Sequence, residues 1–426
     1  MGEPLHEITT LDSGVRVVTE SVPSVRSVAL GFWIRAGSRN ETPDQAGISH
    51  FLEHLLFKGT ERFGSTEIDE IFDGMGAEIN AGTSKETTSV YSRFLDQHLE
   101  RAFDVIGEMV LRPTYPDIDS ERQVVIEEIA MYDDEPSDIV WDVFYRALFG
   151  DHPLGARIIG TADVVGSVPV PAIAAYHDAA YVPDSLVIAA AGSVEHEQVV
   201  ELARCAGDPP AGEPKPAQPA PEPVARREFF EKKTEQYYLC VGAPSIARAD
   251  DRRFALRVLD AVFGGSTSSR LFQEVREKRG LAYSVSSFSS AFADTGAVGV
   301  YLGTRPDNVA EAMDVIGAEL ERIRSEPVSA AELERAKENI KGRTVLAMES
   351  TMGRMNRLGS SVLMDVPLLT IDELLAKVDA VTLEEVGELA VELLAPERLC
   401  AVAVGGDEDI FARALEPISP QLAAAA

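Results

Sequence analysis

The same pattern of a helix, a proline-marked turn and an apolar strand occurs twice in this chain, once in each half. In both copies the strand ends at a glycine. The matching positions, each pair 213 residues apart, are Val168 and Val381, Pro183 and Pro396, and Gly192 and Gly405. Helix–Pro–strand units are common in α/β proteins, but a constant offset across the whole pattern favours an internal duplication. The fold should therefore contain two similar halves.

A proline-rich segment separates these halves. The stretch 208–224 (DPPAGEPKPAQPAPEPV) offers almost nothing to bury, and its prolines favour an extended, polyproline-like spacer. A chain of 426 residues is also too long for one ordinary domain. We predict an N-terminal domain over 1–207, a linker over 208–224 and a homologous C-terminal domain over 225–426.

Strands and helices are mixed within each half. The runs 16–20 and 27–34 are rich in β-branched and aromatic residues and predict strands. Apolar spacing near 3.6 residues predicts a further set of elements as helices. These helices are expected at 48–57, 66–75, 99–110 and 121–131. Because strands and helices do not alternate strictly, we predict an α+β class, with a mixed, mostly antiparallel sheet and helices on one face in each domain.

Composition excludes several classes of protein. A formal charge of −31 repels nucleic acid and anionic membrane and would tolerate basic peptides, although an acidic surface can serve solubility alone. Cys205, Cys240 and Cys400 are few and far apart, so we expect no disulfide framework and a cytoplasmic location. The first seven residues lack the basic and apolar regions of a signal peptide, and the apolar run 185–192 is far too short to span a membrane.

The strongest chemical signal is the H-x-x-E-H motif formed by His50, Glu53 and His54. Residues four apart lie on one face of a helix, so both imidazoles can reach one metal ion. Glu53 borders that face and can hold a metal-bound water without being a ligand. Imidazole and carboxylate suit Zn²⁺, and a catalytic zinc needs three protein ligands with a fourth position open. A histidine pair can also simply pack in a helix, but this spacing with an inserted glutamate favours a metal.

The third ligand must come from elsewhere in the chain. The predicted helix at 121–131 carries Glu121, Glu127 and Glu128. Glu121 and Glu128 are two turns apart and share a face, whereas Glu127 is rotated by about 100° from Glu128. An acid within a largely apolar helix is costly unless it binds a metal or a partner, although a solvated helix face is the ordinary alternative. Spacing alone leaves Glu127 and Glu128 both open.

With the motif extended through Lys58-Gly59-Thr60, the chain resembles the pitrilysin family of inverted-motif zinc peptidases over nearly its whole length. It is most similar to bacterial processing peptidases related to the β subunit of mitochondrial processing peptidase. The resemblance implies that Glu128 is the third zinc ligand, with one Zn²⁺ per chain. It also implies that Glu121 supports the site from behind its ligands.

The segment 271–284 (LFQEVREKRGLAYS) resembles a second motif of this family. The resemblance implies that Arg276 and Tyr283 act near the scissile bond, where a cation and a phenol can stabilise a developing oxyanion. Taken alone, Arg276 is an ordinary surface charge and Tyr283 an ordinary core residue.

Two further pairs match positions that the family uses for substrate. Asn80 and Ala81 match an edge strand that pairs with an extended peptide, a mode of binding that reads backbone more than side chains. Asp138 and Asp142 match acidic positions that favour a basic residue near the cleavage point. A strand-to-turn segment and an exposed helix face are the ordinary alternatives for these two pairs.

In the family, two such chains, or one double-length chain, close like a clamshell around a chamber. The resemblance therefore implies a homodimer in which Arg276 and Tyr283 serve the zinc of the other subunit. We predict a zinc-dependent endopeptidase acting on peptides or unfolded segments, with basic peptides favoured and no nucleic acid or membrane partner. The alternatives are a catalytically inactive core-type subunit and a peptide-binding chamber of the same fold.

Overall fold

The computed structural model describes residues 6–222 and 224–424. The first five residues, on which part of the signal-peptide expectation depends, and residue 223 of the predicted linker lie outside this range, as do residues 425 and 426. The chain forms two compact units. The first comprises 1–130, 156–218 and 345–370, and the second comprises 131–155, 219–344 and 371–426. The two units are each made of three separate segments, whereas the prediction was two continuous domains joined by a linker at 208–224.

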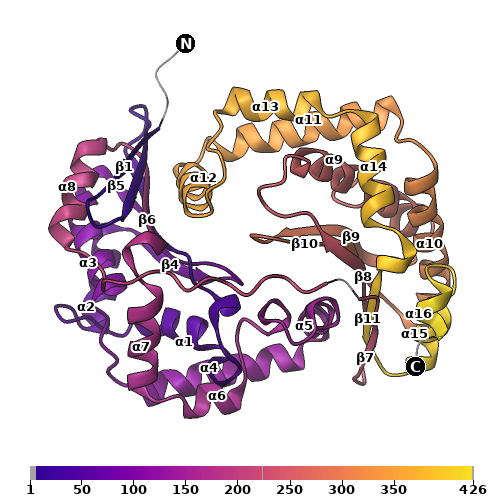
Figure 1. Cartoon of the computed structure of the whole chain (residues 1–426), viewed down its shortest axis with the longest axis horizontal. Helices are drawn as coiled ribbons and strands as arrows, with labels where there is room; N and C mark the ends of the chain where they lie inside the picture. The colour runs from indigo at the N-terminus through magenta and orange to yellow at the C-terminus, as the bar shows by residue number, and fades with distance from the viewer. Residues whose placement is uncertain (1–5, 223, 425–426) are drawn as a thin grey trace. The chain divides into compact units, whose positions relative to one another are not determined.

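The first unit is built on a six-stranded sheet with the order β1-β2-β6-β3-β5-β4. Figure 1 labels β1, β4, β5 and β6 of this sheet. Its strands are β1 (Glu7–Thr10), β2 (Arg16–Ser21), β3 (Ser27–Ile34), β4 (Glu78–Thr83), β5 (Thr88–Leu95) and β6 (Leu186–Gly192). Only the β2–β6 pairing is parallel. The predicted strand at 27–34 is found with the same bounds. Because β4 lies at one edge of the sheet, one side of its backbone has no partner strand.

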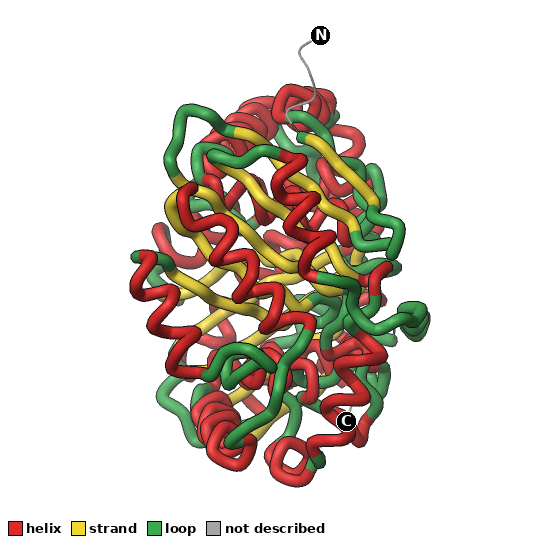
Figure 2. Tube along the Cα trace, turned by 90° about the vertical axis from the view of Figure 1, so that its left-hand side faces the viewer, coloured by secondary structure: helices red, strands yellow, loops and turns green. Residues whose placement is uncertain are grey.

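Helices cover one face of this sheet, as Figure 2 shows for the side of the first unit that faces the viewer. The helices of the first unit are α1 (Ile48–Leu56), α2 (Ser65–Met75), α3 (Leu99–Leu111), most of α4 (Ile118–Asp134), α6 (Ala162–Ser167), α7 (Val170–Ala180), α8 (His196–Ala206) and α12 (Thr351–Leu363). The core lies between α1, α3 and the sheet, where Phe32, Phe51 and Phe103 are almost completely buried. Burial of this apolar face fixes α1 against the sheet.

The second unit repeats this plan with a five-stranded sheet in the order β7-β11-β8-β10-β9. Its strands are β7 (Arg227–Glu231), β8 (Tyr237–Ser245), β9 (Ala282–Ala291), β10 (Gly296–Thr304) and β11 (Cys400–Gly405). Its helices are α5 (Pro136–Phe149), α9 (Arg253–Phe263), a π-helix (Phe272–Glu277), α10 (Val309–Ser325), most of α11 (Ala330–Ala347), α13 (Ile371–Ala380), α14 (Leu383–Leu393), α15 (Glu408–Ala414) and α16 (Pro420–Ala424). Here too one pairing, β7–β11, is parallel and the others are antiparallel.

The repeat read in the sequence is present as structure. The helices α7 and α14 are both eleven residues long, and their first residues, Val170 and Leu383, are 213 positions apart. Each is followed by a short 3₁₀ turn beginning at a proline and then by a fully buried strand, β6 or β11. The predicted α+β class with two similar, mostly antiparallel sheets is confirmed.

Each sheet also receives one helix from the other half of the chain. On the first sheet, α12 covers the face opposite α1, where its Met355 and Leu358 pack on Ala189 and Ala191 of β6. On the second sheet, α5 packs on β8 and β11 through Phe144 and its neighbours. The expectation of helices on one face is therefore incomplete, because short side chains and glycines on the second face let a further helix approach. A Cβ at Gly31 would lie 2.7 Å from Met355 Sδ.

Buried charge fixes α12 in this position. Glu20 of β2 is only 1% exposed, and Arg354 and Arg357 of α12 both donate to its carboxylate. A buried carboxylate is costly unless it is paired, so this contact specifies where α12 docks.

Two features bear on the predicted cellular setting. Cys205, Cys240 and Cys400 are all free thiols. In the described part of the chain, no helix combines the length and apolarity needed to cross a bilayer.

Candidate metal centre

The helix that carries the H-x-x-E-H motif is α1, and its apolar face explains its placement. Its residues Phe51, Leu52 and Leu55 are fully buried against the sheet, so His50, Glu53 and His54 occupy the remaining face. The chain enters α1 through Gly47, whose φ of 92° is left-handed. A Cβ there would lie 2.6 Å from the Ile159 carbonyl oxygen, so only glycine fits this approach.

Glu41 holds the start of α1. Its two carboxylate oxygens accept hydrogen bonds from the backbone amides of Gly47 and Ser49, both at 2.8 Å. Burial raises the pKa of Glu41 to about 7, while its hydrogen bonds to Ser49 and Gly47 act in the opposite direction. Sequence reasoning missed Glu41, because an acid in a loop before the helix belongs to no periodic pattern.

Three potential ligand atoms converge above α1. The Glu128 Oε2 atom lies 3.4 Å from His54 Nε2 and 3.7 Å from His50 Nε2. One ligand atom from each residue lies within 4.8 Å of the other two, and this is the one such group of histidine, cysteine or acidic residues found among residues 6–222 and 224–424. Of the two candidate acids, Glu127 is exposed, whereas Glu128 faces the two histidines.

The chemistry of these atoms fits a zinc ion. Burial, and then the neighbouring His54, lower the pKa of His50 to about 4, so this imidazole is neutral at pH 7. A neutral imidazole that faces a carboxylate at 3.7 Å forms neither an ion pair nor a good hydrogen bond. Ligands at about 2.0–2.1 Å from a tetrahedral zinc are about 3.3–3.5 Å apart, close to the separations found here.

Glu121 fixes the orientation of His54 from behind. Its Oε1 lies 2.8 Å from His54 Nδ1, and its Oε2 lies 2.7 Å from Lys58 Nζ. With a proton on Nδ1, the Nε2 lone pair of His54 points towards Glu128. Carboxylates in this position orient a metal-binding histidine and increase its basicity. Lys58 lies in the extended motif, but its contact with Glu121 was not predicted.

Glu53 borders the same space and is held by Thr83 of β4. The Thr83 hydroxyl donates to Glu53 Oε2 at 2.5 Å. Burial raises the pKa of Glu53, and the hydrogen bond from Thr83 partly opposes this shift. A carboxylate with a raised pKa is a better proton acceptor, which suits a general base. Apart from its place in the predicted edge strand, no pattern in the sequence pointed to a role for Thr83.

The predicted substrate residues Asn80 and Ala81 lie on β4, at the open edge of the first sheet. Along β4, Ile79 and Ala81 pack towards the core beneath α1, while Glu78 and Asn80 are exposed. A cavity of about 840 Å³ lies beside the start of this strand. Its charged lining residues are three acids, Asp69, Asp73 and Glu78, and one arginine, Arg93.

The second predicted motif lies in the second unit. Arg276, in the π-helix, donates from Nη1 to the Tyr283 carbonyl oxygen at 3.0 Å, and its guanidinium lies 4.6 Å from the Tyr283 ring centroid. Tyr283 is 78% exposed, so the ordinary expectation of a core tyrosine does not apply. Asp138 and Asp142 lie on α5, also in the second unit. The structure thus groups His50, Glu53, His54, Glu121, Glu128 and β4 in one unit and the remaining predicted residues in the other.

Comparison with known sequences gives two family matches. The family described as insulinase (peptidase family M16) matches residues 16–162, and the peptidase M16 inactive domain matches residues 167–340. The chain is 43% identical to an uncharacterized zinc protease of Streptomyces coelicolor, over 91% of this chain and 86% of that protein. It is 40% identical to the uncharacterized zinc protease YmxG of Bacillus subtilis, over 92% of this chain and 97% of that protein.

Solved structures share the fold. A protease from Helicobacter pylori superposes with a TM-score of 0.89 at 24% identity, over 94% of this chain and 99% of that chain. A peptidase M16 inactive domain from Pseudomonas fluorescens gives a TM-score of 0.87 at 22% identity, over 94% of this chain and 98% of that chain. At these identities the likeness concerns the fold alone.

Proposed function

This chain belongs to the insulinase family of peptidases, M16, and from that premise we propose that it is a zinc-dependent endopeptidase. In this proposal His50, His54 and Glu128 bind one Zn²⁺. The observation that carries it is the convergence of two imidazole nitrogens and one carboxylate oxygen within 4.8 Å of one another. A zinc ion at this position would lower the pKa of a bound water towards neutrality and polarise a substrate carbonyl.

The protein's own residues then have distinct tasks. Glu53, already held by Thr83, accepts a proton from the attacking water and later delivers it to the leaving amine. Glu121 keeps His54 in one tautomer and orientation. Arg276 and Tyr283 present a guanidinium and a phenol that can donate to the developing oxyanion.

Peptide substrates would bind in an extended form along β4. An unpaired sheet edge offers backbone donors and acceptors at regular spacing, which gives affinity with little sequence preference. Asp69, Asp73 and Glu78 beside this edge, with a chain charge of −31, favour peptides that carry basic residues. We keep Asp138 and Asp142 as further candidates for contacts with a basic side chain.

The proposed assembly is a cytoplasmic homodimer that closes as two halves of a chamber. In this arrangement Arg276 and Tyr283 would act on the zinc site of the partner copy, which explains why one chain carries both motifs. Mixing Glu53→Gln and Arg276→Ala chains tests the assignment in trans. Recovered activity after subunit exchange supports it, while no recovery rejects it.

The proposal itself is tested by metal analysis and peptide cleavage. Purified protein should contain about one zinc per chain and should cleave an unstructured peptide, and a chelator should abolish the cleavage. An inactive core-type subunit, or a chamber that only binds peptides, would fail to cleave with the metal present. A processing role would appear as a small number of preferred cleavage positions in a mixed peptide library.

A further inference from the structure

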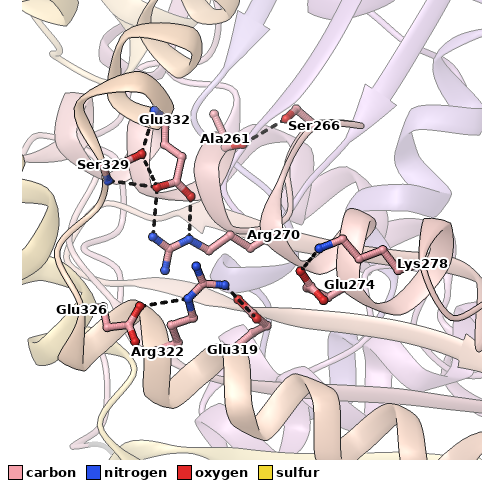
Figure 3. Close-up of polar contacts among 10 residues, drawn as sticks. All are labelled: Ala261, Ser266, Arg270, Glu274, Lys278, Glu319, Arg322, Glu326, Ser329 and Glu332. Carbon is pink, nitrogen blue, oxygen red and sulfur yellow. Dashed lines mark hydrogen bonds and ion pairs between the residues drawn. The ribbon is translucent and has the colours of Figure 1, made fainter.

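A buried arginine, Arg270, stands directly before the segment that carries Arg276 and Tyr283. Arg270 is 7% exposed, and its neighbours Ser269 and Leu271 are almost completely buried. Its guanidinium donates to both oxygens of Glu332, from Nε to Oε1 at 2.8 Å and from Nη2 to Oε2 at 3.1 Å (Figure 3). This two-point contact fixes the guanidinium in angle as well as in distance.

Glu332 is itself fixed at the start of α11. Its Oε2 accepts from the Ser329 backbone amide at 2.9 Å and from the Ser329 hydroxyl at 2.7 Å, while its own amide donates to Ser329 Oγ at 3.2 Å. This reciprocal arrangement is a capping box, which closes the first turn of a helix. Arg270 is therefore bonded to a carboxylate that is held in place at the start of α11, independently of the segment that follows Arg270. The hydrogen bond from Arg270 is also the largest cause that lowers the pKa of Glu332 to about 2.

The neighbouring arginine, Arg322, lies beside Arg270 in Figure 3 but makes a different kind of contact. Its partners Glu319 and Glu326, at 3.4 and 3.0 Å, lie on or just beyond its own helix. Its side chain is 45% exposed. Arg322 thus ties α10 to itself, whereas Arg270 joins two segments 62 residues apart. This difference makes Arg322 a matched control for Arg270.

The segment after Arg270 has a second anchor at its far end. The Leu281 carbonyl oxygen accepts from Thr304 Oγ1 at 2.6 Å and from Asn308 Nδ2 at 2.9 Å. Between the two anchors the chain forms a π-helix, a widened turn that is frequent at functional sites. Arg276 lies within this turn, and Tyr283 lies two residues beyond Leu281.

We propose that Arg270, bound to Glu332, is a positioning residue that holds the π-helix and sets the geometry of Arg276 and Tyr283. The inference depends on the proposed peptidase function, because it assigns Arg270 to the support of that reaction. Arg270 acts through the segment and does not itself contact substrate. Loss of the two-point contact should let Arg276 and Tyr283 shift by about 1 Å. A shift of this size is enough to slow a reaction that needs precise alignment.

The kinetic test compares Arg270→Gln, Arg270→Lys and Glu332→Gln with the control Arg322→Gln in the full-length, zinc-loaded protein. We expect Arg270→Gln and Glu332→Gln to lower kcat by about 10- to 100-fold, with KM changed by less than about threefold. Arg270→Lys keeps the charge but not the fork, so its loss should be smaller. Arg322→Gln should behave as the wild type. Equal kcat values in all four variants would reject the proposal. If Arg270→Gln does not fold, Arg270→Lys can be compared with Arg322→Gln in its place.

A background that already lacks the oxyanion donors separates positioning from general damage. In the Arg276→Ala/Tyr283→Phe protein, adding Arg270→Gln should lower kcat by less than about twofold, because the groups that Arg270 positions are absent. A further loss equal to that seen in the wild-type background would mean that Arg270 acts elsewhere, and the proposal would be wrong.

A third measurement does not require activity. Amide hydrogen exchange over residues 271–283 should become faster in Arg270→Gln and remain unchanged in Arg322→Gln. Unchanged protection in Arg270→Gln rejects the positioning role. If the zinc-loaded wild type cleaves no peptide, the proposed function fails, and the exchange experiment still decides whether Arg270 holds this segment.

Discussion

By element order, α4 and α11 occupy corresponding places in the two halves, and the first turn of each carries one acid that binds a basic side chain. In α4, Glu121 binds His54 and Lys58, so its negative charge supports α1, the helix of the H-x-x-E-H motif. In α11, Glu332 binds Arg270, so its charge supports the segment of Arg276 and Tyr283. The first turns of these two helices thus each carry an acid, but at different positions and with different partners.

The helices that correspond to each other at the start of each unit, α1 and α9, also differ. In α1 the face beside α4 carries His50, Glu53 and His54. The helix α9, which corresponds to α1 by element order, contains no histidine, and its Phe254, Val258 and Leu259 are buried. The described residues of the second unit therefore form the same layers without a cluster of potential metal ligands. Zinc should thus be needed for the chemistry of the first unit and not for its fold.

The largest expected effect comes from His54→Ala. This variant should lose stoichiometric zinc and all measurable peptide cleavage, because two ligands cannot replace three. Its far-ultraviolet circular dichroism should match that of the zinc-free wild type, since the buried face of α1 is unchanged. Retained zinc would reject the ligand assignment, and loss of secondary structure would break the comparison with α9.

Glu53→Gln should keep the metal and lose the reaction. We expect normal zinc content and a fall in kcat of at least about 100-fold, because the amide cannot accept the proton of the attacking water. Zinc analysis and steady-state kinetics on the same preparation measure both. Glu127→Gln, an exposed change on α4, is the control and should leave both unchanged. Wild-type turnover in Glu53→Gln would remove the general-base mechanism.

Local patterns were enough to predict several elements of the first unit, but not the packing of α5 and α12 on the two sheets. The periodicity of 48–57 and the β-branched run 27–34 come from contacts that each segment makes with its own layer. The docking of α12 depends on Glu20 meeting Arg354 and Arg357, more than 330 residues later, and no local pattern contains that pairing. A division of the chain by composition alone therefore assigns α5 and α12 by sequence order and not by packing.

In the candidate site, the spacing of residues in the sequence was enough to predict those side chains that lie together on one helix. His50, Glu53 and His54 were readable because a four-residue interval places side chains on one face. The choice between Glu127 and Glu128 depends on how α4 is rotated against α1, which is a property of tertiary packing. Glu41, Thr83 and Arg270 act through loops and neighbouring elements, so their roles appear only when those elements are placed together.

A more moderate effect is expected for Glu121→Gln. Removing the carboxylate behind a metal-binding histidine typically weakens metal affinity by about 10- to 100-fold. Competition with a chromophoric chelator would measure the dissociation constant for zinc. Glu332→Gln is the counterpart in the second unit and should leave zinc affinity unchanged. If both variants weaken zinc binding equally, the two acids do not have separate tasks.

The smallest effect concerns the dependence of stability on pH. The Glu332 carboxylate has a pKa of about 2 in the folded protein, against 4.5 for a free side chain, with the hydrogen bond from Arg270 as the largest cause. Its stabilising contribution is therefore complete above about pH 4.5 and is lost as the pH falls towards about 2, because the unfolded chain binds the proton first. Urea unfolding of the wild type and Glu332→Gln should show a smaller difference in unfolding free energy near pH 3 than near pH 7. Glu334→Gln is the matched control, because this side chain is on the same helix and 69% exposed. Its unfolding free energy should depend on pH as that of the wild type does. If Glu332→Gln also showed the wild-type dependence of unfolding free energy on pH, the Arg270 contact would not persist in solution. Glu332 would then have no supporting role comparable to that of Glu121.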